Sequence, residues 1–97
     1  MEITKMLTLS TAHITQNTCK RLETDPDDNN LGLSVYKKAD YGFFIYLPAE
    51  DEKLPSHYNS LPEDLYMCLF FAHELGCEIL CFDCDGPIEP FLQTYEW

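Results

Sequence analysis

Four short apolar segments, each five to seven residues long, recur along this chain of 97 residues. They are residues 6–10, 33–37, 41–47 and 77–83, and their apolar runs, alternation and aromatic or β-branched side chains are typical of strands. Residues 38–40 separate the second segment from the third, which is a connection of hairpin length. Because strands this short are stable only within a larger sheet, the pattern predicts one four-stranded sheet.

A first helix is predicted between the first two strands. Thr15 suits the position before the helix, where its hydroxyl accepts a hydrogen bond from a backbone N–H, and the helix runs to about Glu23. Ile14, Cys19 and Leu22 are expected on its inner side.

A second helix is predicted from Ser60 to Leu75. Residues 60–63, Ser-Leu-Pro-Glu, match a capping box, and Gly76 suits a left-handed residue after the helix end. The inward stripe is expected to contain Leu61, Leu65, Cys68, Leu69, Ala72 and Leu75.

The second helix is also apolar on its other side, where a surface helix is usually polar. The residues there are Tyr66, Met67, Phe70 and Phe71. Two explanations remain open: either the chain end, with Trp97, covers this side, or the side contacts a partner or a second copy of the chain.

The element order β-α-β-β-α-β predicts a single α+β domain over residues 1–97. We expect a two-layer sandwich in which two helices cover one face of a four-stranded, mostly antiparallel sheet, with a ferredoxin-like topology. Residues 88–97 are expected to form an irregular tail packed on the domain.

Negative charge is distributed unevenly along the chain, whose formal net charge is −11. Residues 1–53 carry nine acids and six bases, whereas residues 54–97 carry eight acids and no lysine or arginine. Such a segment favours basic protein partners and repels nucleic acid and anionic membranes, although charge of this kind also serves solubility alone. The residues expected to form an acidic docking face are Glu63, Asp64, Glu74, Asp83, Asp85 and Glu89.

The five cysteines are expected to be reduced thiols of a cytoplasmic protein, because residues 1–5 lack the features of a secretory signal. No apolar run is long enough to span a membrane. On a strand, Cys77 and Cys81 lie about 13 Å apart, too far to bind one zinc ion. Asp83-x-Asp85-Gly86 resembles a fragment of a calcium loop, but a strand-ending turn explains it as well. We therefore predict no metal site and no cofactor.

Catalytic motifs are missing from the sequence, so we expect no catalytic residues. The remaining candidate is a cluster of His13 with Asp83 and Asp85 acting in acid–base chemistry. It requires the first and last strands to run parallel, whereas a ferredoxin-like sheet makes them antiparallel.

Several segments together resemble a known family: residues 10–14 (Ser-Thr-Ala-His-Ile), residues 41–42 (Tyr-Gly), residues 83–87 (Asp-Cys-Asp-Gly-Pro) and residues 95–97 (Tyr-Glu-Trp). The chain resembles an uncharacterised domain-of-unknown-function family of small proteins carried by bacterial plasmids, prophages and other mobile elements. The resemblance implies a bacterial or phage origin and brings no known activity. Such elements often carry anti-defence genes, including acidic inhibitors that mimic nucleic acid.

These features favour a non-catalytic, acidic binding protein of a mobile element. The expected partner is a basic protein surface, such as the nucleic-acid channel of a host restriction or CRISPR effector, with Tyr66, Met67, Phe70, Phe71 and Trp97 as apolar contacts. Direct binding to nucleic acid or membrane is not expected. The alternatives are a small metal-dependent or acid–base enzyme that uses His13 with Asp83 and Asp85, and a structural homodimer.

Overall fold

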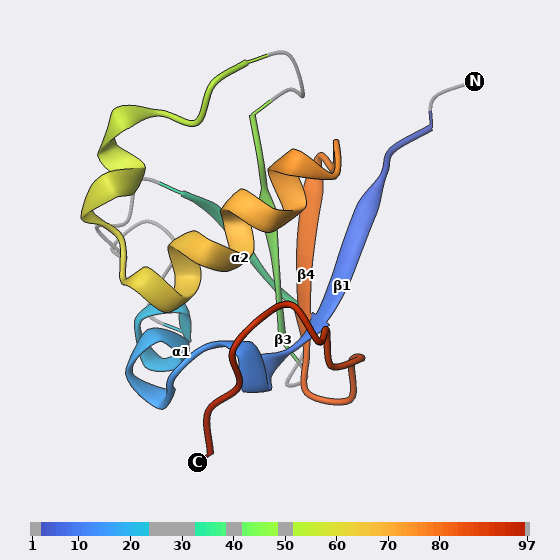
Figure 1. Cartoon of the computed structure of the whole chain (residues 1–97). Helices are drawn as coiled ribbons and strands as arrows, with labels where there is room; N and C mark the ends of the chain where they lie inside the picture. Colours follow the sequence, from blue (N-terminus) through green and yellow to red (C-terminus); the bar gives the residue numbers. More distant parts are fainter. Residues whose placement is uncertain (1–2, 24–32, 39–41, 49–51, 97) are drawn as a thin grey trace.

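The chain folds into two layers, with helices on one side of a four-stranded sheet (Figure 1). The computed structural model describes residues 3–23, 33–38, 42–48 and 52–96. Its elements are β1 (Met6–Ser10), the 3-10 helix η1 (Thr11–His13), α1 (Gln16–Glu23), β2 (Ser34–Lys38), β3 (Gly42–Tyr46), the 3-10 helix η3 (Ser56–Ser60), α2 (Glu63–Glu74) and β4 (Ile79–Asp83). The predicted α+β class and element order are therefore confirmed.

The sheet topology differs from the ferredoxin-like prediction. The strand order is β1-β4-β3-β2, and β1 runs parallel to β4, so the sheet is mixed rather than mostly antiparallel. The last strand takes an inner position between β1 and β3, where both of its edges are paired. This position suits its low polarity, since Leu80, Cys81 and Phe82 are all buried. The parallel pair also brings the ends of the first and last strands together, at Ser10 and Asp83.

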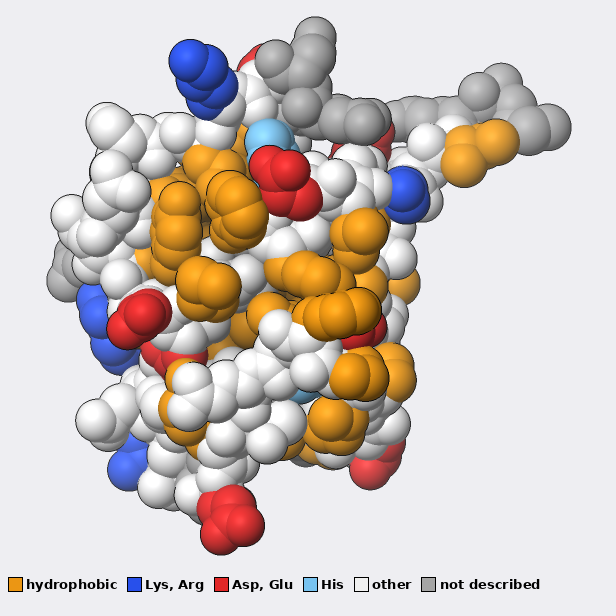
Figure 2. Space-filling view, in the orientation of Figure 1, with side chains coloured by type: hydrophobic (Ala, Val, Ile, Leu, Met, Phe, Trp, Pro, Cys, Tyr) orange, Lys and Arg blue, Asp and Glu red, His pale blue; other side chains and the backbone are white. Residues whose placement is uncertain are grey.

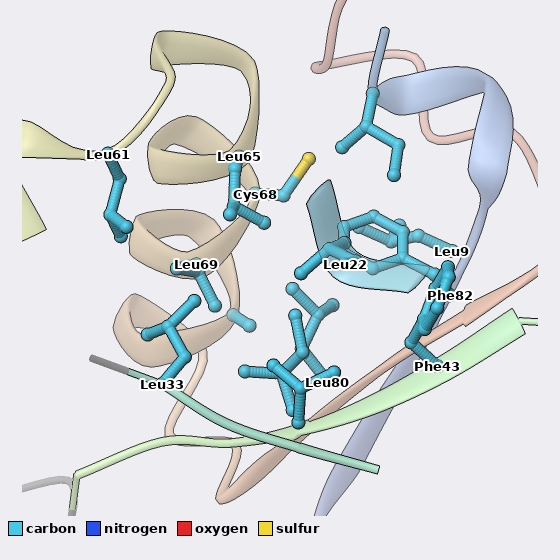
Figure 3. Packing of buried hydrophobic residues seen from close by; sticks show 14 of the residues in the cluster. Leu9, Leu22, Leu33, Phe43, Leu61, Leu65, Cys68, Leu69, Leu80 and Phe82 are labelled. Atoms are coloured by element: carbon cyan, nitrogen blue, oxygen red, sulfur yellow. The ribbon is translucent and has the colours of Figure 1, made fainter. Parts of the chain in front are cut away.

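The hydrophobic core fills the space between the helices and the sheet (Figure 3). Leu65 and Leu69 of α2 and Leu22 of α1 meet Leu80 and Phe82 of β4, and all five side chains are buried. Burying a large apolar side chain stabilises the folded state by about 1.5–3 kcal/mol. The core therefore fixes both helices against one face of the sheet.

The helix ends follow the sequence prediction in two places and contradict it in one. Thr15 caps α1, since its Oγ1 accepts a hydrogen bond from the Thr18 N–H at 3.2 Å. Gly76 follows α2 with a positive φ of 78°. The predicted capping box is wrong: α2 begins at Glu63, after Pro62, and no side chain caps it. Ser60 belongs instead to η3, which ends with a hydrogen bond from the Leu61 N–H to the Tyr58 carbonyl.

The face of the sheet opposite the helices carries aromatic side chains that the sequence analysis had not assigned to a surface. Tyr36 on β2 and Tyr46 on β3 are 57% and 50% exposed, and their rings contact edge to face with centroids 5.3 Å apart. Phe44 lies in the same row as Tyr36 and is half-buried. These residues occupy the side away from α1 and α2 because side chains alternate between the two faces of a strand.

Replacing Gly42 with alanine is expected to destabilise the domain by about 1–3 kcal/mol, because the structure leaves no room for a methyl group. A Cβ atom at this position would lie 1.7 Å from the Phe82 carbonyl oxygen, so the pairing of β3 with β4 would have to shift. Urea unfolding measures the loss, and Ser34→Ala at an exposed site on β2 is the control. Equal stability of the two variants would contradict the close packing of β3 against β4.

Candidate functional site

The chain end folds back onto the segment that follows β1. After β4 the chain turns, and the Ser10 N–H donates a hydrogen bond to the Pro87 carbonyl at 2.9 Å. Farther along, the Tyr95 N–H donates to the Ala12 carbonyl at 2.8 Å. We call residues 84–96 the tail. It lies across η1 on the helix side of the sheet (Figure 1).

His13 holds the tail through both nitrogens of its imidazole. Its Nε2 accepts a hydrogen bond from the Glu89 N–H at 2.9 Å, and its Nδ1 lies 2.8 Å from the Gln93 carbonyl oxygen. Because a carbonyl oxygen only accepts, Nδ1 carries the proton and the ring is the neutral Nδ1–H tautomer. His13 is 1% exposed, and this burial, together with its two hydrogen bonds, is typical of a structural residue.

Asp83 lies at the end of β4, where both oxygens of its carboxylate are engaged. Oδ2 forms an ion pair with Lys38 Nζ at 2.6 Å, and Oδ1 accepts a hydrogen bond from the Asp85 N–H at 2.8 Å. Lys38 reaches across β3 at Gly42, the residue that pairs with both Lys38 and Asp83 and has no side chain to block the approach. The hydrogen bond from Lys38, with a further contribution from the Asp85 N–H, lowers the pKa of the Asp83 carboxyl.

The parallel strands bring the cluster predicted from His13, Asp83 and Asp85 to one end of the sheet, but each member is engaged elsewhere. His13 binds the tail and Asp83 binds Lys38, while Asp85 is exposed in the turn. Asp83, Cys84 and Asp85 offer potential ligand atoms within 4.8 Å of one another. The Asp83 oxygens already have two partners, so this geometry matches a strand-ending turn held by its aspartate.

The six acidic residues assigned to a docking face do not form one cluster, although Glu63 adjoins Asp64 and Asp83 lies close to Asp85. Asp83 is matched by Lys38, and the Glu89 carboxylate accepts a hydrogen bond from the Phe91 N–H within the tail. Glu74 lies at the opposite end of α2 from Glu63, roughly 16 Å away at 1.5 Å per residue. Accordingly, Figure 2 shows acidic side chains at separate positions around a hydrophobic centre. Glu63 and Asp64 are the acidic residues from this set that share a pocket.

This pocket lies between the first half of α2 and the tail, with a volume of about 300 Å³. Its wall combines carboxylates with apolar and aromatic groups, and none of the described residues that line it is a lysine or arginine. Burial, with a smaller contribution from Asp64, raises the pKa of the Cys68 thiol to about 12, so this part of the wall is neutral. The lining residues are His13, Glu63, Asp64, Met67, Cys68, Phe91, Leu92, Gln93 and Tyr95.

The apolar side of α2 is only partly covered by the tail. Leu92 of the tail packs against the core, whereas Met67 and Phe70 remain 48% and 42% exposed. Tyr66 stacks on Phe70 with ring centroids 6.2 Å apart, and Phe71 is half-buried. Trp97 lies outside the described residues. Figure 2 shows the resulting hydrophobic patch at the centre of the helix side.

Phe91 and Tyr95 are site residues that the sequence analysis did not assign to a binding surface. Residues 88–97 were expected to pack on the domain, but Phe91 is 85% exposed. Tyr95 is half-buried and lines the pocket. Their positions depend on the fold of the tail, for which the sequence has no periodic signal.

Nearly the whole chain matches the model of one protein family. Residues 6–97 match the model described as family of unknown function (DUF5983) C-terminal domain. The chain belongs to this family. The match confirms the resemblance to an uncharacterised domain family, and the family description carries no activity. No curated protein and no solved structure matches the chain. In the described part of the chain, no helix combines the length and apolarity that crossing a bilayer requires.

Substituting His13 with alanine is expected to release the tail and to destabilise the domain by about 1–3 kcal/mol, because two partly buried hydrogen bonds are lost. Hydrogen exchange of the Tyr95 amide, which donates to Ala12, measures the release directly. His57→Ala, at an exposed histidine away from the tail, is the control. Unchanged protection of Tyr95 would show that the imidazole does not hold the tail.

The Lys38–Asp83 pair predicts an acid-dependent contribution to stability. Because the pKa of Asp83 is lower in the folded state, the pair stabilises the fold above the usual aspartate pKa of about 3.9, and this contribution is lost as pH falls through the folded value. Lys38→Met is expected to raise the pKa of Asp83, measured by NMR titration of its carboxyl carbon. Lys53→Met at an exposed site serves as the control, and equal titration curves in both variants would exclude the ion pair.

Proposed function

We propose that this domain is a non-catalytic binding module that docks a basic segment of another protein. The docking surface is the helix side near the tail, which we call the α2–tail face and define by Glu63, Asp64, Met67, Phe70, Phe91 and Tyr95. The observation that carries the proposal is the exposure of large apolar side chains directly beside a pocket that contains carboxylates and, among the described residues, no lysine or arginine.

The apolar part of this face supplies the binding energy. Met67, Phe70 and Phe91 are each more than 40% exposed, and Tyr66 stacks on Phe70 to extend the surface. Aromatic side chains and methionine are enriched in the cores of protein interfaces, where they fill pockets of the partner. Burial of such side chains against a partner is favourable at roughly 25 cal/mol per Å² of apolar area.

Charge determines which partners are favoured. The chain has a formal net charge of −11, and its last 44 residues contain no lysine or arginine. This field accelerates association with basic surfaces and weakens as salt screens it. A second copy of the chain is a poorer occupant of the α2–tail face, because a symmetric dimer would bring like charges together.

The partner class that we place first is a nucleic-acid-binding enzyme of a bacterial defence system, whose substrate channel is basic. The domain would then act in the bacterial cytoplasm as an anti-restriction or anti-CRISPR inhibitor carried by a mobile element. The charge balance and the exposed aromatic residues support this choice. On the helix side, the acidic side chains surround a hydrophobic patch, which favours docking through a defined apolar site over mimicry of a regular phosphate backbone.

The enzymatic alternative has less geometric support. Acid–base catalysis by His13 needs a ring nitrogen that is open to a substrate, and both nitrogens are bonded to the tail. The Asp83 carboxylate is likewise engaged by Lys38 and the Asp85 N–H.

A double variant, Met67→Ser with Phe70→Ser, is expected to lose at least tenfold in affinity for a partner captured from bacterial extract, because two interface side chains are removed. Calorimetry with the identified, purified partner measures the affinity at low and high salt. Purified restriction and CRISPR nucleases test the narrower assignment, and inhibition by the wild type should be weakened in the double variant.

The matched control is Tyr36→Ser, which removes a similarly exposed aromatic side chain from the opposite face of the sheet. If capture of the partner depends on Tyr36 and not on Met67 and Phe70, the binding site lies on the open face of the sheet and not on α2. An affinity that does not change with salt would exclude charge complementarity. If the wild-type chain is a dimer and the Met67 and Phe70 substitutions dissociate it, the structural homodimer is favoured.

A further inference from the structure

The pocket between α2 and the tail has features of a binding site for one side chain. Its volume of about 300 Å³ lies at the lower limit for small-molecule sites, so it has room for a side chain rather than for a large cofactor. Its walls come from two segments that are far apart in sequence, the first turns of α2 and residues 91–95. The His13 hydrogen bonds to Glu89 and Gln93 hold the tail wall in place.

The charge inside the pocket is negative. Glu63 and Asp64 lie in the first turn of α2, where a helix N-terminus contributes a charge of only roughly +0.5 against two carboxylates. The negative charge of Asp64 is partly compensated, because its Oδ2 accepts a hydrogen bond from the Thr15 N–H at 2.7 Å. Asp64 also borders a second groove, which is lined by Lys20 and Arg21. Glu63 is exposed and does not border that groove, so its charge faces the pocket without this compensation.

The field of these carboxylates reaches the opposite wall. Burial raises the pKa of the Tyr95 hydroxyl, and the charges of Asp64 and Glu63 raise it further. Tyr95 therefore stays neutral and presents an aromatic ring beside a negative group. Phe91, which is 85% exposed at the same wall, adds a second ring.

Resting on the proposed function, we infer that this pocket binds one arginine side chain of the partner segment. A guanidinium is planar, so it forms hydrogen bonds with a carboxylate such as Glu63 while it stacks on the ring of Phe91 or Tyr95. Its aliphatic stem packs against Met67. Lysine supplies the same charge, but its compact ammonium gives neither the bidentate geometry nor the stacking.

The test uses three short peptides, acetyl-Gly-Arg-Gly-amide and its analogues with citrulline and with lysine in place of arginine, and NMR of the methionine methyl groups. Citrulline has nearly the shape of arginine and no charge. The arginine peptide is expected to shift the Met67 methyl resonance and the Tyr95 amide resonance in a saturable manner. The Met6 methyl on β1 is the internal reference. The lysine peptide should bind several-fold more weakly, and the citrulline peptide should leave Met67 unshifted.

Glu63→Gln is expected to weaken binding of the arginine peptide about tenfold, because a charge-assisted hydrogen bond is lost. Glu74→Gln is the matched control, since it removes an equal charge from an exposed site at the other end of α2. Equal effects of the two variants, equal binding of the citrulline peptide, or shifts that do not saturate would each overturn the inference.

The inference and the proposed function fail in different ways. If a partner needs Met67 and Phe70 but binds the Glu63→Gln variant with unchanged affinity, the docking face stands and the arginine pocket falls. If the arginine peptide saturates the pocket but no partner depends on Met67 or Phe70, the pocket stands and the docking face falls.

Discussion

The parallel pairing of β1 with β4 is the constraint on which the remaining architecture depends. It places Ser10 beside Asp83, so that the chain leaves β4 next to the segment that follows β1. From there the tail runs along η1 and is held by hydrogen bonds to Ser10, Ala12 and His13. Without this register the tail would not reach α2, and the pocket between them would not exist.

His13 is central to this arrangement, although it has no role in catalysis in our proposal. A buried imidazole that both accepts and donates a hydrogen bond satisfies two backbone groups in an irregular segment that has no sheet or helix to satisfy them. The tail thereby acquires a defined conformation without secondary structure. Phe91 remains exposed while Leu92 packs on the core, and this difference gives the tail an inner and an outer side.

Electrostatics acts here at two scales. The net charge of the whole chain favours basic partners at a distance, whereas binding at contact depends on single residues. Lys38 neutralises Asp83, and the Thr15 N–H satisfies one oxygen of Asp64. Among the described residues, Glu63 has neither kind of compensation, and it lies beside exposed apolar side chains. The location of the proposed site therefore depends on which carboxylates the fold leaves uncompensated, and not on the total number of acidic residues.

The sequence by itself determined the elements. The strands, the Thr15 cap and Gly76 all follow from local patterns, because burial alternation, capping and a positive φ are properties of a few neighbouring residues. The capping box at Ser60 failed because α2 begins only at Glu63, after Pro62, and Ser60 is held in the preceding 3-10 turn.

Only the tertiary structure decided how these elements are combined. The place and direction of β1 in the sheet depend on contacts between residues more than 70 positions apart, such as Ser10 with Asp83, and local patterns do not encode them. The same is true of the ion pair between Lys38 and Asp83, which neutralises an acid that a sequence count leaves unmatched. The pocket also depends on the tertiary structure. Its carboxylates are visible in the sequence, but its second wall, the tail, joins the site only through long-range hydrogen bonds to His13 and Ala12.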